Sequence, residues 1–571
     1  MKKNILQGLF VKRTAPFTFI LYLLLLVSLT HLQSCKKDQV EAPKTPQFFD
    51  LNSIKFNGNS LSTLFTNAPL NPVFKINFSK ALDTTNAKKE ILIKEGGFNP
   101  VPVDYSFENS DSTIVLNCVK PLKPFTKYTL ALPVTLKSKT GATFSKYFAL
   151  QIRTGIDTNN KFNVISSVAL LDSVQLKTLQ YFWNFAHPVS GLARERNTSG
   201  DLVTSGGSGM GVMALIAGVN RNFISRSQAV DHLVKMSNFL LYKTKVYHGA
   251  FPHWFNGANG NTIAFSSNDD GADLVETSYL IQGLLTARQY FNGASDKEMS
   301  LREKIDSIWH RVEWNWFTKN GAETNLYWHW SPNKGFIMNM PIRGWNECLI
   351  THVLAASSPT YPVSTAVYHN CWAVNGQIKN GKNFYGYKLP LGSDLGGPLF
   401  FAHYSFLGID PRGLTDQYAD YWQQNQHHAL INYEYCKANP RKYALYGANC
   451  WGLTASDNPW GYDAHSPTND RGVISPTAAL ASMPYTPNES MAALNYFYYK
   501  LGDKIWKEYG FVDAFHIGEV WAANSFLAID QGPIVVMIEN YRSSLLWEQF
   551  TSCLEVKVGM KNLGFSAPYL N

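Results

Sequence analysis

The spacing of apolar residues changes near residue 165, and this change constrains the fold more than any other feature of the chain. Between Phe48 and Thr154, short runs alternate apolar and polar residues, and turns rich in Pro, Asn, Asp and Gly separate them. Such runs are typical of strands in a small β-sandwich. After Ile165 the apolar residues recur with a helical period, which predicts an all-α region. The expected strands include VFKINF (73–78), TIVLNC (113–118), YTLALPV (128–134) and FALQIRT (148–154).

The resulting domain plan is a sandwich over 48–154, a linker over 155–164 and a helical domain over 165–571. Within the sandwich, the segments NPVFKINFSKALDTTN and LKPFTKYTLAL resemble bacterial immunoglobulin-like domains, a resemblance that implies the fold only. About twelve helices are expected in the helical domain, with loops too long for a simple bundle. This combination favours helices paired in a closed toroid, an (α/α)6 barrel, whose inner helix ends surround one depression. The helices are expected at about 169–186, 209–220, 225–243, 271–291, 297–317, 345–357, 362–374, 396–407, 415–438, 475–483, 487–501 and 533–553, and the prediction allows a break within the last one.

A carboxylate-rich loop leads directly into an apolar helix over residues 266–291. Asp269, Asp270, Asp273 and Glu276 fall within eight residues, and a helix opening near residue 271 would place Asp273 and Glu276 on one face. The positive end of a helix favours ionised carboxylates, so these residues suit binding of sugar hydroxyls, or a base, better than proton donation. Each of them could instead cap the helix, and together they could bind calcium, although their spacing is not that of an EF-hand loop.

Two isolated carboxylates in apolar surroundings are candidates for acid or base chemistry. Glu347 lies beside Trp345 at a predicted helix start, where desolvation would raise its pKa as a general acid requires. The alternative is a capping glutamate at the third helical position. Asp530 lies between an apolar FLAI segment and the Gly532-Pro533 pair, so it could be functional or could cap a helix starting there.

A long loop over residues 447–467 combines aromatic and polar side chains. Loops of this length in a compact domain tend to be functional. The chain also carries fifteen Trp, and aromatic rings suit both a core and a surface on which sugars stack. The loop is therefore predicted to form a sugar-binding wall that includes Trp451, Trp460, Tyr462, Asp463 and His465. Trp345, beside Glu347, is a further predicted substrate-binding residue.

The N-terminus has the pattern of a bacterial lipoprotein. Residues 1–34 combine a basic start with an apolar run that is short for a membrane-spanning helix, and LQSC resembles a lipobox ending at Cys35. A charged tether follows over 35–47. These features predict lipidation at Cys35 and anchoring in the outer membrane, on its periplasmic face or at the cell surface. An uncleaved membrane anchor is the alternative.

Composition excludes two other classes of protein. The net charge of +9 is contributed in part by four basic residues of the leader, and no Lys/Arg run interleaves with aromatics, so we expect no nucleic-acid partner. The seven cysteines show no C-x-x-C pair and no clustering with histidine, which argues against structural zinc.

Four motifs in order resemble glycoside hydrolase family 144, the glucoamylase-like domains that act on β-1,2-glucan. The resemblance covers most of 165–555 and implies an (α/α)6 barrel, inversion of the anomeric centre and no metal or other cofactor. It also implies that Glu347 is the acid, that Asp530 is the base, and that Asp269, Asp273 and Glu276 bind substrate. The motifs are SSNDDGADLVETSYLIQGLLTARQYF, RGWNEC, NPWGYDAHSPTNDRG and AIDQGPIVVMIENYRSSLLW.

The sequence thus predicts an exported β-1,2-glucan hydrolase with a supporting immunoglobulin-like domain. Family members include enzymes that cleave within the chain and one that releases disaccharides from chain ends, and the motifs do not separate these modes. A non-catalytic surface glycan-binding lipoprotein and a polysaccharide lyase on a similar toroid are the alternatives from other classes.

Overall fold

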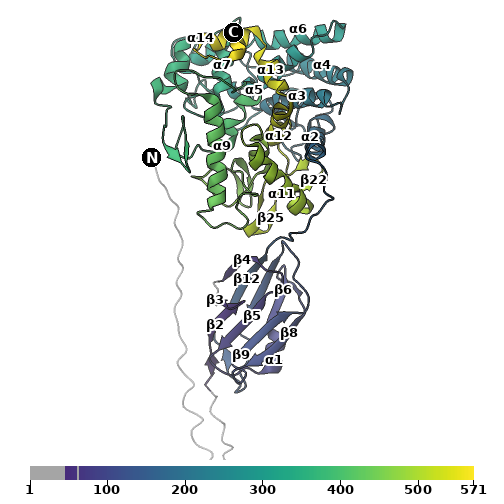
Figure 1. Ribbon diagram of the computed structural model, residues 1–571, viewed down its shortest axis with the longest axis vertical. Coiled ribbons are helices and arrows are strands. Elements are labelled where there is room, and N and C mark those ends of the chain that lie inside the picture. Colours follow the sequence, from purple (N-terminus) through teal and green to yellow (C-terminus); the bar gives the residue numbers. More distant parts are fainter. Residues whose placement is uncertain (1–44, 61–62) are drawn as a thin grey trace, which may run out of the picture. The chain divides into compact units, whose positions relative to one another are not determined.

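The computed structural model describes residues 45–60 and 63–571 (Figure 1). The predicted leader, Cys35 and nearly all of the tether lie outside these residues, so their assignments stay predictions. Among the described helices, none combines the length and the apolar character that a membrane crossing requires.

Two five-stranded sheets form the N-terminal domain, in the orders β4-β12-β10-β6-β7 and β3-β2-β5-β9-β8. All pairings within them are antiparallel except that of β4 with β12. The bounds are β1 Phe48–Phe49, β2 Leu51–Phe56, β3 Asn59–Ser60, β4 Leu64–Ala68, β5 Val73–Phe78, β6 Leu92–Glu95, β7 Asn99–Pro100, β8 Val103–Glu108, β9 Thr113–Cys118, β10 Lys127–Leu132, β11 Thr143–Phe144 and β12 Phe148–Thr154. A short helix, α1, spans Thr84–Glu90 and is capped by Asp83.

Strand alternation explains why these segments form a sandwich. In β5, Phe74, Ile76 and Phe78 are buried whereas Val73 and Lys75 are exposed, so one face of the strand enters the core. The predicted strands over 73–78, 113–118 and 148–154 are confirmed. The strand predicted over 128–134 ends at Leu132, because Pro133 has no N–H to continue the ladder.

Helices dominate the remainder of the chain. They are α2 Ser167–Trp183, α3 Ser205–Asn220, α4 Arg226–Tyr242, α5 Leu274–Tyr290, α6 Asp296–His310, α7 Leu349–Ser357, α8 Thr365–Val367, α9 Tyr421–Ala438, α10 Pro476–Ala481, α11 Pro487–Ile505, α12 Ala528–Ser543, α13 Leu545–Thr551 and α14 Leu554–Asn562. Tighter or wider turns are η1 Trp314–Thr318, η2 Tyr368–Trp372, η3 Val374–Gly376, η4 Leu399–Ala402, η5 Ser405–Leu407, η6 Ile517–Glu519 and η7 Pro568–Leu570.

Two-stranded and three-stranded ribbons connect these helices. Their strands are β13 Leu202–Thr204, β14 Trp254–Asn256, β15 Thr262–Ile263, β16 Ala272–Asp273, β17 His329–Trp330, β18 Asn383–Phe384, β19 Tyr387–Lys388, β20 Ala455–Asn458, β21 Gly461–Ala464, β22 Trp506–Lys507, β23 Gly510–Phe511, β24 Phe515–His516 and β25 Trp521–Ala522.

Three predicted helices differ from those observed. The segment 396–407 contains only η4 and η5, and it starts with Gly396 and Gly397 at φ of 91° and 86°, a conformation that no helix uses. The segment 362–374 forms α8 followed by η2 and η3. The predicted helix 533–553 starts at Ala528 instead, so Pro533 lies inside α12 rather than at its start, and the break that the prediction allowed divides it into α12 and α13.

Helices α3, α5 and α12 are buried along most of their length and on nearly all sides, which identifies them as inner helices. At the crossing of α3 and α5, an added Cβ on Gly209 would lie 2.1 Å from the carbonyl oxygen of Tyr279. One on Gly283 would lie 2.1 Å from the carbonyl oxygen of Gly209. The two helices can approach this closely only because both positions are glycine.

Candidate active site

Asp273 connects a short strand to the start of an inner helix. It ends β16, pairs with His329 of β17, and is the N-cap of α5, where its Oδ1 accepts the N–H groups of Val275 and Glu276 at 3.0 and 2.9 Å. The helix therefore starts at Leu274 and not near residue 271 as the sequence suggested. Asp273 does cap the helix, and its second oxygen, Oδ2, remains available for other partners.

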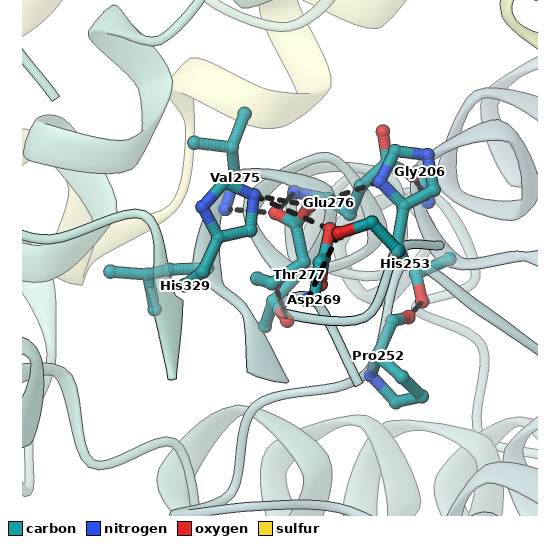
Figure 2. Close-up of polar contacts among 12 residues, drawn as sticks. Gly206, Pro252, His253, Asp269, Val275, Glu276, Thr277 and His329 are labelled. Carbon is teal, nitrogen blue, oxygen red and sulfur yellow. Dashed lines mark hydrogen bonds and ion pairs between the residues drawn. The ribbon is translucent and has the colours of Figure 1, made fainter. Parts of the chain in front are cut away.

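Two histidines contact the carboxylates at this point (Figure 2). Nδ1 of His253 lies 3.0 Å from Oδ2 of Asp273, and Nε2 of His329 lies 3.5 Å from Oδ2 of Asp269 and 3.7 Å from Oδ2 of Asp273. Oε2 of Glu276 accepts hydrogen bonds from Gly206 N–H at 2.8 Å and from the Thr204 hydroxyl at 3.0 Å. The first turns of α3 and α5 are thereby joined through Glu276.

The carboxylates and His253 shift one another's pKa values. Burial disfavours a charged His253, but Glu276, Asp273 and Asp269 outweigh it and raise the pKa of His253 to about 9. Burial and the charge of Asp273 raise the pKa of Asp269 to about 7. Burial also raises the pKa of Glu276, whereas hydrogen bonding and the positive charge of His253 overcome burial and lower the pKa of Asp273. The cluster thus pairs an imidazolium with an ionised Asp273.

His253, Asp269 and Asp273 are also the group among the described residues that could hold a cation. Each offers one ligand atom, and these atoms lie within 4.8 Å of one another. A histidine must lose its proton to bind a metal, and the raised pKa of His253 opposes that loss. Direct pairing of His253 with Asp273 accounts for the same geometry.

Asp270 does not join this cluster. Its Oδ2 accepts a hydrogen bond from Asn333 at 3.0 Å, and that bond, together with one from Ser331, lowers its pKa.

Glu347 lies in a turn, two residues before α7, and is not the third helical residue considered as its alternative. Tyr279 of α5 and Ser405 of η5 both donate hydrogen bonds to its main-chain oxygen, which fixes the turn. Burial, together with the charges of Asp273 and Glu276, raises the pKa of the half-buried side chain to about 7. Glu347 can therefore hold a proton near neutral pH.

Asp530 is the third residue of α12, so it does not cap a helix that begins at Gly532-Pro533. Its side chain is 2% exposed, and burial together with the charge of Asp513 raises its pKa well above the ordinary value. Asp513 was not selected by sequence reasoning, although it shares the signal that selected Asp530, a lone carboxylate among apolar residues.

Tyr404 lies within range of the charges of both Glu347 and Asp530. Burial raises the pKa of its phenol, and the charges of Asp530, Glu347 and Glu276 raise it further. Burial and the charge of Asp530 likewise raise the pKa of the phenol of Tyr462 in β21. The charges of Glu347, Glu276 and Asp530 all act on the Tyr404 phenol, so these acidic groups lie in one region of the helical domain.

The predicted aromatic wall is only partly accessible. Trp460 and Tyr462, on the β20–β21 hairpin, are 60% and 48% exposed. Trp451 is fully buried and donates its indole N–H to the carbonyl of Glu489, and His465 is buried as well, so the prediction that these two contact sugar is wrong. Length and aromatic content could not show which rings of the loop turn inward.

Two further predicted contacts have other partners. Trp345 is buried against Trp372 and Phe406, so its ring packs in the core next to the turn of Glu347 and does not face solvent. Asp463 forms an ion pair with Arg471 at 2.9 Å. Sequence reasoning also missed His253 and His329. No sequence motif marks them, because only the folded structure brings them next to Asp273.

A carboxyl group with a raised pKa and a second, buried carboxyl group are the pair that glycoside hydrolases use as acid and base. The family model described as "Putative glucoamylase" matches residues 339–554, and a bacterial Ig-like domain model matches residues 58–154. The chain is 50% identical to an endo-β-1,2-glucanase from Chitinophaga pinensis, solved with sophorotriose and glucose. The alignment covers 71% of this chain and all of that structure, with a TM-score of 0.70.

Two further matches come from Parabacteroides distasonis. A β-1,2-glucanase structure is 36% identical, with 90% of this chain and 73% of that chain covered and a TM-score of 0.68. An exo β-1,2-glucooligosaccharide sophorohydrolase is 45% identical over 416 residues, or 69% of this chain, and the match spans 57% of that relative's length. The chain therefore belongs to the glucoamylase-like family of glycoside hydrolases, family 144.

Proposed function

We propose that this protein hydrolyses β-1,2-glucan with Glu347 as general acid and Asp530 as general base. The observation that carries the proposal is the difference between the surroundings of the two carboxyl groups. Glu347 has a pKa of about 7, whereas Asp530 is buried beside the carboxyl group of Asp513. Relatives that act on β-1,2-glucan or its oligosaccharides support the choice of substrate.

In the proposed reaction, Glu347 gives its proton to the glycosidic oxygen as the bond to the anomeric carbon breaks. Water attacks that carbon from the opposite face, and its proton passes to Asp530, directly or through a substrate hydroxyl. The product then has the inverted, α configuration. An inverting pair leaves room for water, so we expect the two carboxyl groups to lie roughly 6.5–9.5 Å apart, or somewhat farther with a relay.

The acidic cluster is proposed to bind sugar hydroxyls. Asp273 is held ionised by His253, and Asp269 and Glu276 lie beside it, so the cluster offers acceptors whose charge is partly balanced. Tyr462 and Trp460 expose rings on which sugars can stack.

The arrangement of the helices and the location of the protein are further parts of the proposal. Inner helices α3, α5 and α12 support an (α/α)6 toroid with the site at their N-terminal ends. Lipidation of Cys35 would anchor the protein in the outer membrane.

The test is incubation with linear β-1,2-glucan, with analysis of product size and of the anomer released first. We expect hydrolysis with α-anomeric products, and E347Q and D530N should each lower kcat by about 10²–10⁴-fold while still binding glucan. Near-wild-type turnover in either variant, or β-anomeric first products, would contradict the mechanism.

The same experiment separates the alternatives. Products that absorb in the ultraviolet would indicate a lyase, and binding without cleavage would indicate a glycan-binding protein. A mixture of oligosaccharides would indicate endo action, as in the Chitinophaga relative, and sophorose alone would indicate exo action, as in the Parabacteroides sophorohydrolase.

A further inference from the structure

Asp513 is a buried residue next to Asp530, and hydrogen bonds fix its main chain. It precedes β24 by two residues and is 2% exposed, as Asp530 is. Its N–H donates to the carbonyl of Ser525 at 3.0 Å, and its carbonyl accepts from the hydroxyl of Ser475 at 2.6 Å. The main chain therefore fixes where the Asp513 carboxyl can point.

The hydrogen bonds of this carboxyl assign a different partner to each oxygen. Oδ2 of Asp513 accepts the N–H of Asp457 at 2.6 Å. Oδ1 of Asp513 and Oδ2 of Asp530 are buried, and neither meets a donor group among the described residues, while the two side chains lie close enough to act on each other's pKa as hydrogen-bonding partners do. Ionised carboxylates only accept hydrogen bonds, so a hydrogen bond between the two carboxyls requires a proton on one of them.

We propose that Asp513 and Asp530 share one proton, and that Asp513 is the positioning residue for the base. This inference rests on the proposed function. When the proton is on Oδ1 of Asp513, that O–H donates to Oδ2 of Asp530 and leaves Oδ1 of Asp530 to accept the proton of water. The shared proton moves from Asp530 to Asp513 when the O–H bond on Asp530 breaks and an O–H bond on Asp513 forms. This transfer within the pair leaves its net charge at −1.

The surrounding charges favour a single proton. Asp457 also faces the pair, but Arg196 lies 3.2 Å from its carboxylate and offsets its charge. The remaining titratable neighbours are the phenols of Tyr404 and Tyr462. Two adjacent buried carboxyls cannot both ionise without a large electrostatic cost, and neither Asp513 nor Asp530 forms an ion pair within the described part of the chain.

Infrared spectroscopy tests the shared proton without relying on activity. At pH 6 the wild-type protein should show a protonated-carboxyl C=O band that is absent from both D513N and D530N, because that band requires both carboxyls. E347Q should retain it. D410N, which alters a buried aspartate paired with Arg412, is the matched control and should also retain it. A band that persists in D513N would overturn the proposal.

Kinetics test the positioning role. The amide of D513N can donate to Asp530 while its oxygen accepts from Asp457, whereas D513L can do neither. We expect D513L to lower kcat by about 10–100-fold more than D513N, with KM nearly unchanged because Asp513 is buried behind Asp530. Equal losses in two folded variants would contradict the proposal, and if D513L does not fold, the infrared bands decide.

Failure of this inference is distinguishable from failure of the proposed function. If wild-type protein does not cleave β-1,2-glucan, the function is wrong whatever the infrared bands show. If it cleaves the glucan and D513N keeps the band, only the shared proton is wrong.

Discussion

Glu347 becomes a candidate acid through its surroundings rather than through its position in a helix. An ordinary glutamate is ionised at neutral pH, but burial and the nearby charges of Asp273 and Glu276 raise the pKa of Glu347 to about 7. The cluster that is proposed to bind sugar thus also helps to keep the acid protonated.

This coupling predicts a pH dependence. A general acid acts only when protonated, so on the alkaline side kcat/KM should fall as the pH rises through the pKa of Glu347, about 7. The measurement is hydrolysis of β-1,2-glucan across pH 5–9. With an aryl β-sophoroside, whose leaving group needs no proton, E347Q should remain active without this alkaline decline. An E347Q that is inactive on an aryl substrate which wild type cleaves would contradict the acid role.

His253 should stabilise the fold in a pH-dependent way. Its pKa is about 9 in the folded protein and about 6.5 in an unfolded chain, so its contribution is complete below pH 6.5 and is lost as the pH rises toward 9. We expect the difference in unfolding free energy between wild type and H253N to shrink over that interval. Urea unfolding at pH 6, 7, 8 and 9 measures it, and a difference that grows with pH would contradict the assignment.

At the scale of elements, three inner helices bring their first turns to the site. Gly206 of α3 and Glu276 of α5 are hydrogen-bonded, and Asp530 lies in the first turn of α12. An added Cβ on Gly207 of α3 would lie 2.6 Å from Ala528 of α12, so these helix starts are also in close contact. Packing of the inner helices therefore sets the positions of the proposed binding and catalytic groups.

The crossing of α3 and α5 gives a direct test of this dependence. G209A places a methyl group 2.1 Å from a main-chain oxygen, which cannot move aside as a side chain can. We expect a loss of about 1–3 kcal/mol in stability, or more, together with reduced activity. G447A is the matched control, because the nearest atom to its new methyl lies 3.9 Å away. Thermal unfolding of both variants decides, and equal stability would show that the crossing relaxes.

Sequence periodicity predicted the strands of the sandwich and most helices because local burial determines both. It failed at 396–407, where apolar residues pack although glycines hold the chain in turns. It also misplaced the start of α12, because Pro533 resembles a first helical residue but lies farther along. Both errors occur where tertiary packing overrides a local signal.

The site was predictable where a carboxylate stood in an unusual local setting, as Glu347 and Asp269 do. His253, His329 and Asp513 were missed because their partners lie 20, 60 and 17 residues away in the chain, at Asp273, Asp269 and Asp530. Trp451 was misassigned because an exposed and a buried tryptophan look alike in sequence. Long-range pairing and side-chain orientation are what the sequence alone did not provide.

At the scale of the whole molecule, the sandwich and the helical domain have separate hydrophobic cores. The sandwich core is built around Phe74, Ile76 and Leu130, and the core of the helical domain begins at Leu170. The end of the linker belongs to the helical domain, since the ring of Phe162 lies 4.6 Å from that of Tyr498 and packs on Gly502 of α11.

Deleting residues 36–160 should therefore leave a helical domain that folds and hydrolyses β-1,2-glucan. The cut retains Lys161, whose N–H donates to the carbonyl of Tyr499 at 2.7 Å, and it retains Phe162, so the first contacts of the linker with α11 survive. The measurements are a cooperative unfolding transition and the product distribution beside that of the full chain. The same truncation carrying E347Q is the control, because hydrolysis in that variant would come from a contaminant. A truncation that unfolds cooperatively but does not hydrolyse glucan would show that the immunoglobulin-like domain contributes to the site itself.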